Sequence, residues 1–152
     1  MSNYTTDSIT YYKQNVGCSN ITLNEKMRLA TICDVSYAKQ STLIPHELKP
    51  EVQDARFNVP PVVLSHCLRF LCYHHIHNIV NRQQSLRDLY LTIHEKYFVT
   101  EGTISNSLTV LGVVNEVIGE KEVAYYCYDT ALQCEGMIRL SAAKRKLNLN
   151  MT

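Results

Sequence analysis

The amino-acid sequence predicts an α+β protein that is mostly helical, and three observations support this prediction. Of the 152 residues, 45% are hydrophobic and 19% are charged, which is the composition of a folded domain. From residue 60 onward, apolar side chains recur at the three- and four-residue spacing of helices with one buried face. Residues 113–128 depart from that spacing and have the composition of a β-hairpin. We therefore expect one domain at 59–147, an extension at 1–58 and a tail at 148–152.

The N-terminal extension contains one predicted helix and a connector. Residues 22–40 begin with Thr22, and Glu25 three residues later completes a capping box in which each side chain satisfies the other's free backbone donor. Residues 41–58 carry Pro45 and Pro50, which favour a connector with room for a short helical turn.

Two helices are predicted next. Pro60 and Pro61 open the first, because a proline in the first helical turn removes an N–H that would have no partner. Ser85 is the expected N-cap of the second, with Asp88 in its first turn. The predicted buried positions are Leu64, Cys67, Leu68, Leu71, His75 and Ile79 in the first helix, and Leu86, Leu89, Ile93, Tyr97 and Phe98 in the second.

A third helix is predicted at about 103–111, followed by a hairpin and a last helix. Ile104, Leu108 and Leu111 are expected to face inward, which leaves the hydroxyl and amide side chains of this segment pointing outward. Two β-rich runs then flank Gly119, which suits a hairpin turn because glycine adopts a positive φ freely. The last helix, about 130–147, ends in three basic residues.

The order helix, helix, turn, helix, hairpin matters because a helix-turn-helix places its second element in the DNA major groove. Residues 60–129, most clearly VTEGTISNSLTVLGVVNEVIGEKEVAYYCYD, resemble the winged helix-turn-helix superfamily of bacterial regulators, with the ArsR- and MarR-like repressors as the nearest pattern. The resemblance implies a homodimer that binds double-stranded DNA sequence-specifically and regulates transcription without a cofactor. The expected DNA contacts are Thr103, Ser105, Asn106, Ser107 and Thr109 of the recognition helix, Lys121 of the wing at about 113–128, and the supporting Arg87 and Lys96.

Features of the sequence also fit two other functions. The net charge of +1 is low for a protein that binds phosphates, and the predicted recognition helix has no Arg or Lys. An interaction module that binds protein partners within a larger assembly is therefore the main alternative. Residues 66–77 are rich in histidine and cysteine, which suggests a metal-responsive regulator as a third possibility. The spacing lacks a paired four-ligand motif, so we expect no metal site. With no catalytic motif, we expect no enzyme either.

The six cysteines are expected to be reduced thiols of a cytoplasmic protein. This expectation depends on the polar residues 1–14, which lack a basic-then-apolar leader. No apolar run approaches the roughly 18 residues that a membrane span needs, so no membrane partner is expected.

Overall fold

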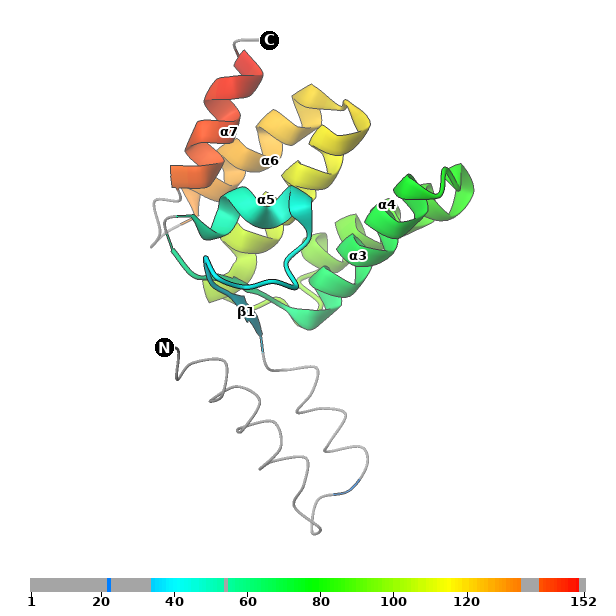
Figure 1. Ribbon diagram of the computed structural model, residues 1–152, viewed down its shortest axis with the longest axis horizontal. Helices are drawn as coiled ribbons and strands as arrows, with labels where there is room; N and C mark the ends of the chain where they lie inside the picture. The colour runs from blue at the N-terminus through cyan, green and yellow to red at the C-terminus, as the bar shows by residue number, and fades with distance from the viewer. Residues whose placement is uncertain (1–21, 23–33, 54, 135–139, 151–152) are drawn as a thin grey trace. The chain divides into compact units, whose positions relative to one another are not determined.

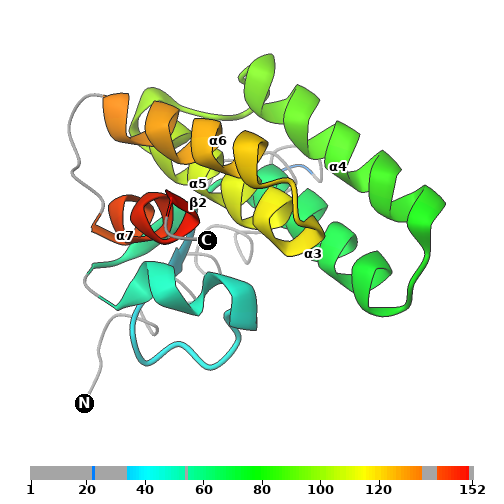
Figure 2. The ribbon, with the colours of Figure 1, turned by 90° about the horizontal axis from the view of Figure 1, so that it is seen from above.

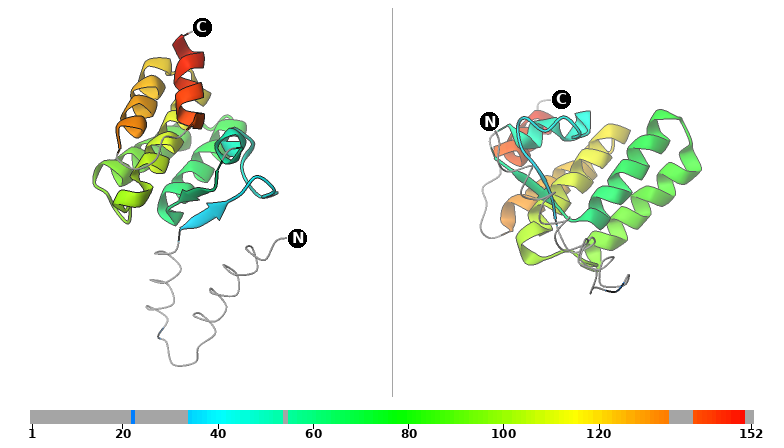
Figure 3. Two further views of the ribbon diagram at one scale, coloured as in Figure 1. Left: turned by 90° about the vertical axis from the view of Figure 1, so that its left-hand side faces the viewer. Right: turned by 60° about the horizontal axis from the view of Figure 1, so that its bottom comes forward.

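Short apolar segments before residue 60 form a small antiparallel sheet in the computed structural model, which describes residues 22, 34–53, 55–134 and 140–150. Strand β1 (Val35–Tyr37) pairs with β2 (Phe57–Val59), and Tyr37 lies opposite Phe57. A 3-10 helix, η1 (His46–Val52), lies between the strands in sequence. Phe57 and Val59 are buried whereas Asn58 between them is exposed, as the alternation of a strand dictates. Figure 3 shows the sheet and η1 beside the helices.

These first elements correct two predictions about the N-terminal region. Val35–Tyr37 is a strand, so the helix predicted at 22–40 is wrong at its end, while residues 23–33 lie outside the described residues. The chain divides into two units after Cys33, and residues 34–58 belong with the helices that follow rather than with an extension. The short helical turn predicted within 41–58 is confirmed as η1.

Helices α3 (Pro61–His75) and α4 (Ile79–His94) form an antiparallel hairpin, which is seen in Figures 1 and 2. The proline start of α3 is confirmed. The start predicted for α4 is wrong, because its N-cap is Asn78, whose side chain accepts a hydrogen bond from the backbone N–H of Asn81 at 3.1 Å. Ser85 instead lies buried within α4, where its hydroxyl donates to the carbonyl oxygen of Asn81 at 2.8 Å.

Helix α5 (Glu101–Ile118) begins two residues earlier and ends seven residues later than predicted. Thr100 and Thr103 form a capping box at its start. Gly119 ends it with a φ of 86°, a left-handed conformation that favours glycine, and α6 (Lys121–Gln133) follows at once. The hairpin predicted at 113–128 is therefore wrong: those residues belong to two helices, and the positive φ of Gly119 caps a helix instead of turning a hairpin.

The last helix, α7 (Leu140–Asn150), replaces the single helix predicted at about 130–147, whose first residues belong to α6. Its position is fixed by Arg145, whose guanidinium bonds the carboxylates of Glu51 at 2.7 Å and Glu116 at 2.9 Å. The carbonyl oxygen of Glu47 accepts a third bond from Arg145, at 2.7 Å. Because these partners come from η1 and α5, the cation of α7 joins three elements that are far apart in sequence.

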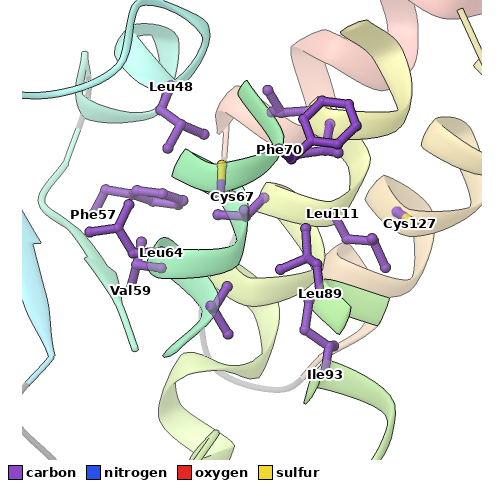
Figure 4. Packing of buried hydrophobic residues seen from close by; sticks show 14 of the residues in the cluster. Leu48, Phe57, Val59, Leu64, Cys67, Phe70, Leu89, Ile93, Leu111 and Cys127 are labelled. Atoms are coloured by element: carbon purple, nitrogen blue, oxygen red, sulfur yellow. The ribbon is translucent and has the colours of Figure 1, made fainter. Parts of the chain in front are cut away.

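The hydrophobic core lies between the sheet, η1 and the helices, and Figure 4 shows part of it. Leu64, Cys67 and Leu71 of α3 are buried there, as predicted. The predicted burial of Leu68, His75 and Ile79 is wrong, since α3 turns Val63 and Phe70 toward the core and ends before Ile79. Tyr97 and Phe98 are exposed as well, because they follow the end of α4. Among the described residues, we find no helix with the length and apolar character required to cross a membrane.

Candidate functional site

The five residues predicted to read DNA bases are buried in α5. Their exposed fractions are 4% for Thr103, 9% for Ser105 and 2% for Asn106, and Ser107 and Thr109 have none. A side chain inside the protein does not reach a base edge, so their predicted outward orientation is wrong. The reason is that α5 is the central helix of the unit, in contact with α3, α4, α6, β2 and η1.

Hydrogen bonds inside the protein explain how these polar side chains are accommodated. The hydroxyls of Ser107 and Thr109 each donate to the carbonyl oxygen four residues earlier, at 2.9 Å. Ser105 donates across to the carbonyl oxygen of Ala131 in α6 at 2.9 Å. Asn106 donates its amide to the carbonyl oxygen of Asn58 in β2 at 2.7 Å. Buried donors with such partners hold elements together and are not available to a ligand.

The three basic residues predicted to contact DNA, Arg87, Lys96 and Lys121, do not form one cluster. Lys96 follows α4 and makes an ion pair with Glu101 at 2.8 Å. Lys121 is exposed at the start of α6. Arg87 is exposed on α4, and no residue that the structure describes pairs with its guanidinium. These cations come from three different segments, and Arg87 lines the groove described below.

The histidine- and cysteine-rich segment 66–77 is spread around α3. Cys67 is fully buried, and burial raises the pKa of its thiol to about 12. Cys72 is exposed, and the ring of His75 hydrogen-bonds the carboxylate of Glu47 at 3.2 Å. Over the described ranges, no three histidine, cysteine or acidic side chains come together in a way that could hold a metal ion.

Three helices enclose an open groove of about 690 Å³, a volume typical of ligand-binding clefts. Its floor includes Ile93 of α4, Leu111 of α5 and Cys127 of α6, which gather on one side of the close-up in Figure 4. Its rims carry exposed aromatic and aliphatic side chains from α4 and α6. The lining residues are Gln83, Leu86, Arg87, Tyr90, Ile93 and His94 of α4, Ile104, Leu108, Leu111 and Asn115 of α5, and Val123, Tyr126, Cys127 and Thr130 of α6.

The burial of polar residues on α5 accounts for the apolar character of this groove. With hydroxyls and amides turned toward the sheet and α6, the stripe Ile104, Leu108 and Leu111 is left to line the cavity, and the first two are only partly buried. Tyr90 and Tyr126 at the rims are 51% and 70% exposed. The sequence predicted that Ile104, Leu108 and Leu111 face inward, and they do pack in or against the core. It did not predict that they also line a groove, because spacing alone does not distinguish a core stripe from the wall of a groove.

The chain was compared with protein family models, curated proteins and solved structures, and none of the three comparisons gave a match.

Proposed function

We propose that residues 34–152 act as a protein-interaction module, and that the groove between α4, α5 and α6 receives an amphipathic helix of a partner protein. The observation that carries this proposal is the Ile104–Leu108–Leu111 stripe, which lines an open groove: Leu111 is buried at its floor, and Ile104 and Leu108 are only partly buried. Burial of such a stripe against a partner removes apolar surface from water, which is the main favourable term in association.

The geometry of the groove favours a helix over other peptide conformations. All of its walls are helices, and their lining residues follow rows spaced by three and four positions, the ridges between which another helix packs. No strand edge lines it, so an added β-strand would find no backbone partners. From Ile104 to Asn115, the floor extends over about 16 Å, room for roughly three turns of a bound helix.

The charges around the groove indicate the sign of the charged side chains on the partner helix. Arg87 lies on one rim beside Gln83 and His94, and no carboxylate is among the lining residues. An unpaired guanidinium next to apolar surface favours a carboxylate, which it can bind through two parallel hydrogen bonds. The expected partner is therefore an amphipathic helix with aspartate or glutamate beside its apolar face.

DNA binding by a homodimer stays a prediction from the sequence. Its support is now limited to Arg87, Lys96 and Lys121, since the side chains expected to read bases are buried and the segment expected to form the wing is helical. The interaction module requires none of the contradicted features, which is why we prefer it.

The test is a fluorescence anisotropy titration of the full chain with two synthetic helices of about 20 residues, long enough to be helical in isolation. Both carry leucines at positions i, i+3, i+4 and i+7, and one has glutamates where the other has lysines. We expect the acidic peptide to bind with a Kd in the micromolar range, and the basic peptide to bind at least roughly tenfold more weakly.

Two neighbouring residues of α4 provide a matched pair of variants. Tyr90, 51% exposed, lines the groove, whereas Leu91, 43% exposed, does not. Tyr90→Glu should abolish peptide binding and Leu91→Glu should leave it unchanged, and neither exposed site should affect folding. Equal effects of the two variants would contradict the groove assignment. No binding of either peptide, together with salt-dependent binding of DNA fragments, would overturn the proposal in favour of the regulator.

A further inference from the structure

The turn between α3 and α4 carries a second exposed apolar surface, which lies beyond the end of the groove and does not line it. Ile76, Ile79 and Val80 are 62%, 58% and 76% exposed. Figures 1 and 2 both show the connected end of this hairpin projecting away from α5, α6 and α7. We call these three residues the hairpin tip. Aliphatic side chains gathered at a projecting end cost solvation free energy unless something covers them.

The charged residues around the tip are almost all basic. Residues 61–94, which span both helices, contain three arginines and five histidines but only one carboxylate, Asp88. That carboxylate lies 3.6 Å from the guanidinium of Arg69, away from the tip. The hairpin therefore carries a net charge of +2 with neutral histidines, since three arginines are offset by one aspartate.

The ring of His74, close to the tip, is held in its neutral form by its neighbours. Arg82 of α4 hydrogen-bonds the ring nitrogen Nδ1 of His74 at 3.4 Å, which requires that nitrogen to be unprotonated. Burial, Arg82, His75 and His77 lower the pKa of His74, and the more distant Glu47 of η1 opposes them. Protonation of His74 breaks its bond to Arg82 and leaves two cations beside the aliphatic residues.

We propose that the hairpin tip docks on the surface of an anionic lipid bilayer, more strongly at mildly acidic than at neutral pH. The aliphatic side chains enter the interfacial region of the bilayer, and the arginine and histidines contact lipid phosphates and carboxylates. A bilayer suits this surface better than a protein does. The tip is convex and presents only three aliphatic side chains, less than one side of a stable protein interface, whereas lipids adapt to a projecting shape.

The test is co-sedimentation of the full chain with phosphatidylcholine vesicles, with and without phosphatidylserine, at about pH 7.4 and about pH 5. We expect the bound fraction to depend on phosphatidylserine and the partition coefficient to rise roughly tenfold from the higher to the lower pH. Replacement of Ile79 and Val80 by asparagine should abolish binding. Leu147→Asn is the matched control, because Leu147 is an equally exposed aliphatic residue at 62% on α7, and binding should be unchanged.

A second pair of substitutions tests the histidines without removing apolar surface. His74→Gln with His77→Asn should keep the binding at neutral pH and reduce its increase in acid. Asparagine is chosen because the backbone of His77 has a φ of 57°, a conformation that asparagine tolerates. Binding that ignores phosphatidylserine, or that survives the tip substitutions, would overturn the proposal. Binding of soluble polyglutamate in preference to the vesicles would overturn it in favour of an acidic protein partner.

Discussion

Replacement of Gly112 by alanine tests how closely α5 and α6 approach each other. A Cβ atom at position 112 would lie 2.4 Å from Cε1 and 2.8 Å from Cδ1 of the Tyr128 ring, far inside van der Waals contact. The ring has no room to move away, because Tyr128 is fully buried and its hydroxyl donates to the carboxylate of Glu116 at 2.6 Å. That carboxylate is in turn held by Arg145.

The magnitude follows from two opposing effects. Alanine is favoured over glycine inside a helix by about 1 kcal/mol, because it loses less conformational entropy on folding. Overpacking of a core typically costs 1–3 kcal/mol, and a contact as short as this one belongs at about the upper end of that range. We therefore expect Gly112→Ala to lower the free energy of unfolding by about 2 kcal/mol, which corresponds to a decrease in Tm of roughly 5–10 °C.

Chemical denaturation monitored by circular dichroism measures this change, and Gly102→Ala is the matched control. Gly102 lies in the first turn of the same helix, and a Cβ there would meet nothing within 4 Å. The control variant should be as stable as the parent or more stable by up to about 1 kcal/mol. If Gly112→Ala were also as stable as the parent, α5 and α6 would not cross at this glycine, and the packing described above would be refuted.

Two further predictions concern buried polar groups. Asn106→Ala should lower the free energy of unfolding by about 1–2 kcal/mol, because it removes the hydrogen bond to the carbonyl oxygen of Asn58. The control Asn81→Ala, at an exposed position, should lower it by less than about 0.5 kcal/mol. Equal urea midpoints of the two variants would contradict a stabilising role of the Asn106 hydrogen bond. The raised pKa of the Cys67 thiol means that its contribution to stability is complete below about pH 9 and is lost as the pH rises toward about 12. Urea denaturation at about pH 7.5 and about pH 10.5 should show a loss of about 2 kcal/mol from this group that Cys67→Ala lacks, and identical pH dependence in both proteins would refute it.

The helical hairpin was largely predictable from local sequence. Pro60 and Pro61 mark the start of α3, and the spacing of Leu64, Cys67 and Leu71 identifies its buried face, because a proline and an apolar period act within one helix. Gly119 was correctly identified as a position of positive φ. Its context was misjudged, since the same conformation ends a helix as readily as it turns a hairpin.

The sequence by itself determined that the chain is mostly helical, that α3 begins at its prolines, and that Cys67 is buried. Tertiary structure decided that the polar side chains of α5 are buried. It also decided that the β-rich residues 113–118 and 123–128 form helices. Local sequence predicts that hydroxyl and amide groups such as those of Ser105 and Asn106 face solvent. They are buried because the carbonyl oxygens of Ala131 and Asn58, which are distant in sequence, accept their hydrogen bonds. Valine-rich segments favour strands only weakly, and burial against neighbouring helices outweighs that preference. The groove follows from the same packing, because α5 is buried on most of its surface and only Ile104 and Leu108 of its aliphatic stripe stay partly exposed between α4 and α6.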